Sequence, residues 1–181
     1  MILSDSELVE MLREPRTRRE GFAVLVKQYS EKLYWKVRRI VLSHEDANDV
    51  LQNVFIKVWS NLQNFQGKSS LSTWLYRIAV NESLDFLRKQ KLADKVSTDE
   101  DDSVASRLMS DEYFDGDEVQ TRLQEAVARL PEVQRTVFSL KYFEEMKYSE
   151  ISQIINTSEG ALKASYQKKK KKITEYLHLF D

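Results

Sequence analysis

The sequence contains only four glycines and two prolines among its 181 residues. Both residue types mark tight turns and the ends of elements, so few tight turns are available to connect the strands of a sheet. The apolar residues recur at steps of three and four rather than in alternation, which is typical of amphipathic helices. The pattern therefore predicts an all-α fold.

The first ninety residues contain four apolar stripes of helical period, which predict four helices around one hydrophobic core. Pro15 is expected to end or interrupt the first of these helices. Polar residues and Gly67 between positions 61 and 71 separate the third helix from the fourth. Ser or Thr followed three residues later by an acidic residue is a common helix start. N-terminal caps are predicted at Ser4 (with Glu7), Ser43 (with Asp46) and Ser72.

The charges are distributed in three blocks, although the whole chain has a formal net charge of only -1. Residues 1–91 hold 15 basic and 11 acidic side chains, residues 92–118 hold 2 and 10, and residues 119–181 hold 11 and 8. The middle block is acidic and poor in apolar residues, which is typical of a flexible linker. A weak helix over residues 104–109 is compatible with it. Two small helical domains, 1–91 and 119–181, are therefore predicted on either side of an acidic linker, 92–118.

The second domain ends in a pattern typical of DNA-binding proteins. Pro131 is predicted in the first turn of a helix, since proline is tolerated there. A short helix through Ile151 and Ile155 is followed by Asn156, Thr157 and Ser158, and Ser158 can cap a last helix. Helix, three-residue turn and helix form the helix-turn-helix pattern.

The sequence contains no residue pattern typical of a catalytic site or of a metal site. The chain has no cysteine and two isolated histidines, and its glycines do not cluster into a phosphate-binding loop. The segment that starts at Asp111 does not match a calcium-binding loop, because Tyr113 and Arg122 occupy its third and twelfth positions, where carboxylates are needed. We therefore expect no enzyme activity, metal or cofactor. The start lacks the features of a signal peptide and no apolar run is long enough to span a membrane, so a soluble cytoplasmic protein is expected.

The last helix carries the clearest binding signal, a polar face containing small residues that allow close approach to a major groove. Lysines on this face can contact phosphates or guanine edges, and the run of residues 169–172 would add a salt-sensitive attraction. A lysine run can also be a solvated surface, but the cap and turn before it favour DNA binding. The predicted duplex contacts are Ser158, Glu159, Gly160, Lys163, Ala164, Gln167 and Lys168.

Residues 64–88 form a second candidate surface, in which a loop leads into a helix with aromatic, amide and guanidinium groups. Such groups hold and read unstacked bases in single strands. Trp74 is expected in the hydrophobic core more than in base stacking. The predicted single-strand contacts are Lys68, Ser70, Trp74, Arg77, Asn81 and Arg88.

These segments resemble the extracytoplasmic-function (ECF) sigma factors of bacterial RNA polymerase, over nearly the whole chain. Residues 46–55, with Val58 and Trp59, are similar to the segment by which sigma domain two binds a coiled coil of the largest polymerase subunit. Residues 65–88 resemble the segment that reads the minus-ten element, and residues 130–166 resemble sigma domain four, which binds the minus-thirty-five element as duplex. The polymerase contacts implied by the resemblance are Asp46, Asp49, Gln52, Asn53 and Phe55.

The resemblance implies core RNA polymerase and promoter DNA as partners, together with an anti-sigma factor that regulates the protein. Two departures from the family pattern stand out. Asn48 and Asn53 occupy positions where the family usually has Glu, which removes a possible ion pair at Asn53. Lys169 occupies a position that is usually small and apolar, where its stem could lie along the packed surface with the ammonium in water.

Two elements about two helical turns of DNA apart are separated by about 70 Å. A 27-residue linker averages about 30 Å as a coil but can extend to roughly 90 Å, so polymerase would have to hold it extended. A helix-turn-helix repressor or activator is an alternative for residues 119–181, but it leaves residues 46–55 and 65–88 unexplained. A helical adaptor without a DNA role is disfavoured by the basic face of the last helix.

Overall fold

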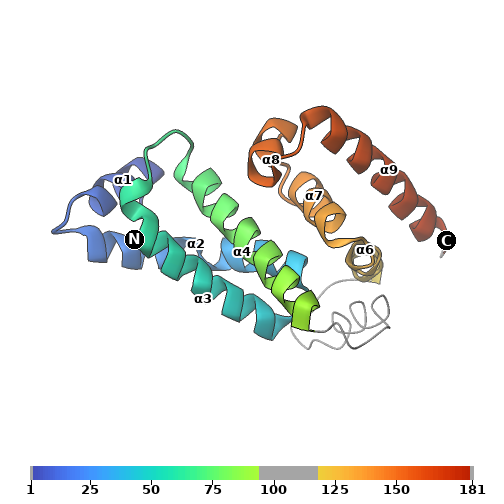
Figure 1. Cartoon of the computed structure of the whole chain (residues 1–181), viewed down its shortest axis with the longest axis horizontal. Coiled ribbons are helices and arrows are strands. Elements are labelled where there is room, and N and C mark those ends of the chain that lie inside the picture. Colours follow the sequence, from blue (N-terminus) through green and yellow to red (C-terminus); the bar gives the residue numbers. More distant parts are fainter. Residues whose placement is uncertain (1, 94–117, 180–181) are drawn as a thin grey trace.

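The structure is a computed structural model that describes residues 2–93 and 118–179. Every regular element in these two ranges is a helix (Figure 1), which confirms the all-α prediction. The elements are α1 (Asp5–Arg13), α2 (Arg18–Val41), α3 (His44–Asn61), the 3-10 helix η1 (Leu62–Asn64), α4 (Leu71–Ala93), α6 (Glu118–Ala128), α7 (Glu132–Tyr142), α8 (Tyr148–Ile155) and α9 (Glu159–His178).

Helix α2 is the centre of the first domain, where it packs against α1, α3 and α4. Its contact with α1 is close: a Cβ atom added at Gly21 would lie 2.9 Å from the Cβ of Met11. Only glycine fits between the two helices there without a shift of backbone or side chain. The apolar stripes predicted for α2, α3 and α4 meet in one core, in which Leu25, Leu33, Val54 and Leu75 are fully buried.

The helix caps confirm two of the three predictions for this domain. Ser4 and Glu7 form the predicted capping box, and the Ser43 hydroxyl accepts from the backbone N–H of Asp46 at 3.3 Å. The prediction of Ser72 as the cap of α4 is wrong. Ser70 precedes the first helical residue instead, and its hydroxyl accepts from the backbone N–H of Thr73 at 3.1 Å.

Only the two ends of the predicted linker, residues 92–93 and residue 118, fall within the described residues. Helix α4 continues through Ala93 and α6 begins at Glu118, so the ends of the predicted linker belong to helices. The acidic segment between them, with the weak helix expected over residues 104–109, lies outside the described residues.

The second domain consists of α6, α7, α8 and α9, and α9 packs against the other three. The prediction that Pro131 lies in the first turn of α7 is wrong by one position. Pro131 is the N-cap, and the first helical residue is Glu132. A core of Ala126, Val127, Phe138, Tyr166 and Ile173 holds α6, α7 and α9 together.

The two domains also contact each other. Helix α7 packs against α2 and α4, and α8 packs against α4. The hydrophobic core of the first domain continues into the second through residues such as Leu140, Ile151 and Leu162. No sequence pattern predicted this contact.

Candidate nucleic-acid and protein interfaces

Helices α8 and α9 form the predicted helix-turn-helix. Asn156 ends α8 in the left-handed conformation, with φ 59° and ψ 45°, which asparagine tolerates better than most residues. The Ser158 hydroxyl caps α9 by accepting from the backbone N–H of Ala161 at 3.3 Å. The Ser152 hydroxyl donates to the carbonyl of Thr157 at 2.6 Å and ties the turn to α8. The turn therefore has local bonds that hold α9 in a defined direction.

Helix α9 divides into a buried side and an open side, as predicted. Leu162, Tyr166 and Ile173 are buried against the domain. A Cβ added at Gly160 would meet no atom within 4 Å, so the start of the helix is open to an approaching surface. We call the open side the recognition face. All seven predicted duplex contacts are exposed on it: Ser158, Glu159, Gly160, Lys163, Ala164, Gln167 and Lys168.

The lysine run extends this positive surface along α9. Lys170, Lys171 and Lys172 are exposed, whereas Lys169 is partly buried. Burial, together with the neighbouring charges of Lys172 and Lys168, lowers the pKa of Lys169. The partial burial agrees with the expectation that the stem of Lys169 lies along the packed side of the helix.

The loop before α4 and the first turns of α4 form the second candidate surface. Gly67 adopts a φ of +70°, the left-handed conformation that glycine allows at little cost. Phe65 packs on Trp74 with ring centroids 5.0 Å apart, and both rings lie against the core. This confirms the core role expected of Trp74. Lys68 is exposed, while Ser70 caps α4.

An open groove lies beside this loop. It is lined by residues of α1, including Val9 and Arg13, and by Phe65, Gly67 and Ser70 of the loop. A planar group could enter it from solvent and contact both apolar and polar side chains. Sequence reasoning did not predict that α1 contributes to this surface.

The polar residues of α4 lie at steps of four and seven and therefore share one face. Asn81 and Arg88 are exposed, and Arg88 pairs with Asp85 at 2.9 Å. Arg77 is partly buried, and its Nε is buried without a hydrogen-bond partner in the described part of the chain. A buried donor without an acceptor is costly, so an incoming acceptor at this position would be favoured.

The predicted polymerase contacts lie on α3. Asp49, Gln52 and Asn53 are exposed at neighbouring helical positions, and Asp46 is partly buried in the first turn. Phe55 points toward the interior, where its ring meets Phe22 edge to face at 6.5 Å. The structure therefore brings the polar members of this set together on one face and places Phe55 beneath them.

Two exposed apolar residues join this α3 surface, and the sequence analysis did not single out the first of them. Ile56 is 57% exposed and follows Gln52 and Asn53 by one helical turn, while Trp59 is 41% exposed. Ile56 does not belong to the buried stripe of α3 formed by Val54 and Val58. This position off the stripe is the feature of the sequence that could have identified Ile56 as an exposed apolar residue. We call the surface of Asp49, Gln52, Asn53 and Ile56 the α3 face. Exposed apolar residues within a polar surface are typical of protein contacts.

Metal chemistry has no candidate in the described ranges, where no group of three or more His, Asp or Glu side chains could hold an ion. Within the same residues, no helix is long and apolar enough to cross a membrane.

Comparison with known proteins identifies both domains. Residues 25–93 match the family model of sigma-70 region 2, and residues 120–173 match that of sigma-70 region 4. The chain is 33% identical over 153 residues to the ECF RNA polymerase sigma factor SigW of Bacillus subtilis, covering 80% of this chain and 82% of that protein. It is 32% identical over 169 residues to the RNA polymerase sigma-H factor of Pseudomonas aeruginosa, covering 88% and 86%.

Solved structures share the fold. The sigma factor RpoE of Bartonella quintana, in complex with the anti-sigma factor NepR, matches with a TM-score of 0.70 and 20% identity over 88% of this chain and 98% of that one. CnrH, in complex with the cytosolic domain of CnrY, matches with a TM-score of 0.65 and 18% identity over 98% and 96%. The two matched regions and the identity to SigW show that the chain belongs to the ECF family of RNA polymerase sigma factors.

Proposed function

We propose a division of labour between the two domains of this sigma factor, with residues 1–91 for polymerase binding and minus-ten recognition and residues 119–181 for minus-thirty-five recognition. The α3 face would dock on the coiled coil of the largest polymerase subunit. Its exposed amides can hydrogen-bond, while Ile56 supplies apolar area at the centre of the contact. Asp46 and Phe55 would support this face from its edge and from beneath.

The surface made by the 65–70 loop and α4 would bind the melted non-template strand. A base leaving the stack could enter the groove beside the loop, where Gly67 leaves room. The amide of Asn81, exposed further along α4, would contact the polar edge of a base outside the groove. Lys68, Arg77 and Arg88 would neutralise phosphates, and Trp74 would support the loop through Phe65. Ser70 would fix the start of α4 and so the direction of these groups.

The recognition face of α9 would enter the major groove of the minus-thirty-five element. Its exposed small residues allow the backbone to approach the base edges, and Lys163, Gln167 and Lys168 carry the donors. Each module alone would bind weakly, but tethering makes the second contact occur at high effective concentration.

The proposal also assigns a non-enzymatic role, a cytoplasmic location and regulation by an anti-sigma factor. One structural relative was solved in complex with an anti-sigma factor, NepR, and the other in complex with the cytosolic domain of CnrY, and the first complex supports the last assignment. Polymerase itself carries out the RNA synthesis, and the sigma factor supplies promoter choice and assistance in DNA opening.

The single observation that carries the proposal is the separation of two differently built surfaces on two domains, a groove with a loop on one and an exposed α9 face on the other. We test it with core polymerase and a promoter mapped by sequencing transcripts that depend on this protein. Asn81→Ala should reduce the open complex, measured by permanganate reactivity of the minus-ten thymines. Lys163→Glu should instead weaken the initial duplex complex by about tenfold, with a smaller salt slope.

Lys27→Glu is the matched control for the lysine reversal, because Lys27 is exposed on α2 and belongs to neither of the two proposed DNA-binding surfaces. It should bind and open DNA like the parent protein. Parent-like behaviour of Asn81→Ala and Lys163→Glu would contradict the residue assignments.

A further inference from the structure

The end of helix α1 lies beside the loop that precedes α4, and Arg13 lies at this junction. It is the last residue of α1, and its side chain is exposed. A Cβ added at Gly67 of the loop would lie 3.5 Å from Nη2 of Arg13. Arg13 also lines the open groove between α1 and the loop. A guanidinium of α1 therefore lies next to the loop that is proposed to bind the single strand.

The Arg13 guanidinium makes no ion pair with the described residues. Glu10 lies one turn earlier on α1 and Glu14 follows Arg13 directly. Acidic and basic side chains three residues apart on a helix are neighbours that commonly pair. Here the guanidinium lies at Gly67 instead of pairing with Glu10. Its donors are therefore available to a ligand that reaches the loop.

The turn after α1 holds the end of this helix in place. The Thr17 hydroxyl donates to the carbonyl of Met11 at 2.9 Å. Arg18 donates from Nε to the carbonyl of Leu12 at 3.0 Å and from Nη2 to the carbonyl of Arg13 at 3.3 Å. These bonds satisfy carbonyls that have no partner within the last turn of a helix. The Arg13 side chain therefore extends from a fixed backbone.

Two further cations lie close to the groove in sequence. Arg16 is exposed in the turn, makes no ion pair with the described residues, and precedes Thr17, which lines the groove. Lys68 is exposed and follows Gly67 in the loop. We call Arg13 and Arg16 the arginine edge. The sequence analysis singled out Lys68 but neither of these arginines.

The groove itself is acidic. The described residues that line it contribute one guanidinium, that of Arg13, and four carboxylates: Asp5, Glu7, Glu10 and Glu14. Neither Glu10 nor Glu14 has a cationic partner among the described residues. Carboxylates at this density repel an anionic phosphate but have no such effect on a neutral base. The groove therefore suits a base, whereas the sugar-phosphate backbone needs cations at the edge of the groove.

We propose that the arginine edge binds the phosphates of the non-template strand that flank the base held in the groove. The base enters past Gly67, while Arg13 holds a neighbouring phosphate away from the carboxylates. The planar guanidinium can donate to two phosphate oxygens at once. This contact comes from α1 and adds to those of the loop and α4. It rests on the proposed function, because the strand must be captured at this groove.

The test uses the holoenzyme and two promoter probes, a fork with a single-stranded minus-ten region and the upstream duplex alone. Arg13→Gln removes the charge and keeps a polar side chain at an exposed position. It should weaken binding to the fork about fivefold at low salt. The slope of log affinity against log salt should fall by about 0.7, the value for one phosphate of a single strand. Arg16→Gln should act in the same direction, and neither variant should change binding to the upstream duplex.

Uncharged methylphosphonates at single positions of the strand locate the contact. In the parent protein, one or two of these replacements should weaken binding about fivefold. In Arg13→Gln the same replacements should have no further effect, because the protein partner of that phosphate is already lost. A general loss of folded protein or of positive charge would not depend on the position of the replacement.

Lys32→Gln is the matched control, because it removes one positive charge from another exposed residue of the first domain. Lys32 lies about 21 Å along α2 from the start of this helix, where the turn ends. It should bind both probes like the parent protein. Circular dichroism checks that each variant keeps its helices, and Arg16→Gln with the same methylphosphonates decides the question if Arg13→Gln does not fold.

Parent affinity of Arg13→Gln and Arg16→Gln for the fork would overturn the arginine edge, as would an equal loss for Lys32→Gln. Methylphosphonate effects that are the same in Arg13→Gln and in the parent would also overturn it. Failure of the proposed function has a different signature, since the parent itself would then bind the fork no better than the upstream duplex. If the parent prefers the fork and both variants match it, the strand is captured without the arginine edge.

Discussion

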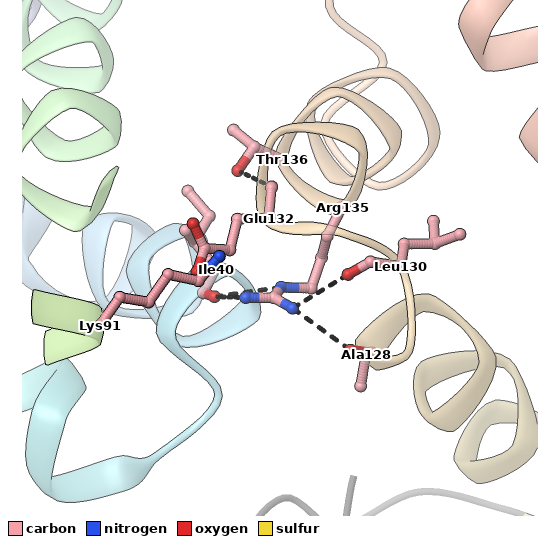
Figure 2. A network of polar contacts seen from close by, with 7 residues as sticks. All are labelled: Ile40, Lys91, Ala128, Leu130, Glu132, Arg135 and Thr136. Atoms are coloured by element: carbon pink, nitrogen blue, oxygen red, sulfur yellow. Dashed lines mark hydrogen bonds and ion pairs between the residues drawn. The ribbon is translucent and has the colours of Figure 1, made fainter. Parts of the chain in front are cut away.

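Replacement of Arg135 by Gln should destabilise the protein by about 3 kcal/mol. Its guanidinium donates to three carbonyls, those of Ile40, Ala128 and Leu130 (Figure 2). Burial lowers the pKa of Arg135 to about 10, against a weaker opposing effect of Glu132, so the group is still charged at neutral pH. Hydrogen bonds from a charged donor contribute about 1.5–3 kcal/mol each. The Gln amide can replace some of these bonds, and removal of the charge relieves the cost of burying it. The expected loss in free energy of unfolding is therefore less than the sum over all the bonds, about 3 kcal/mol.

The assay is thermal unfolding of the full chain, followed by circular dichroism at neutral pH. For a protein of this size, 1 kcal/mol shifts Tm by about 2–4 °C, so Arg135→Gln should lower Tm by about 10 °C. Arg129→Gln is the matched control. Arg129 is half exposed, pairs with Glu125 at 2.9 Å on the surface of α6, and lies 5.7 Å from the centre of the Tyr176 ring. Loss of these two exposed interactions should shift Tm by only about 2–4 °C. Equal shifts for the two variants would refute the assigned role of the buried guanidinium.

Three further predictions address separate parts of the molecule. Ile56→Asp should weaken binding to core polymerase at least about tenfold, and Tm should stay nearly unchanged because Ile56 is exposed. Binding is measured by fluorescence anisotropy titration, and the affinity of the parent protein in the variant would contradict this prediction. Gly160→Ala should stabilise α9 by about 0.5 kcal/mol yet weaken binding to minus-thirty-five duplex, and unchanged affinity would mean that no DNA approaches this backbone. Hydrogen bonds from Ser4 lower the pKa of Glu7 below its ordinary value of 4.5. The stability that these bonds contribute is therefore present above pH 4.5 and is lost as the pH falls through the lowered pKa. Glu7→Gln should make the free energy of unfolding depend less on pH in this acid range.

Local patterns predicted the local structure well. The helical periods, the Ser158 cap and the division of α9 into a buried and an open side all follow from spacing within one helix, and the structure confirms them. The wrong cap at Ser72 shows the limit of this reasoning. Ser70, Ser72 and Thr73 all lie near the start of α4, and the position of the first helical residue, Leu71, decides which hydroxyl becomes the cap.

Contacts between distant residues could not be predicted from a single sequence. Arg135 lies 95 residues from Ile40 and Glu144 lies 108 residues from its ion-pair partner Lys36, so no spacing rule connects them. In the sequence, Arg135 looks like one more charge on an amphipathic helix, although the structure buries it. Ile56 is the opposite case, because this apolar residue lies on the outside of the protein, and its position off the stripe of Val54 and Val58 was the local sign of it.

The central claim is that the two domains bind different forms of the same promoter, and truncated promoter probes test it most directly. The holoenzyme is titrated with a fork that joins minus-thirty-five duplex to the single minus-ten strand, and with probes that lack either part. Asn81→Ala should lose about tenfold in affinity only on probes that contain the single strand, and Lys163→Ala only on probes that contain the upstream duplex. Loss by both variants on the same probes, or by neither on the fork, would contradict the account.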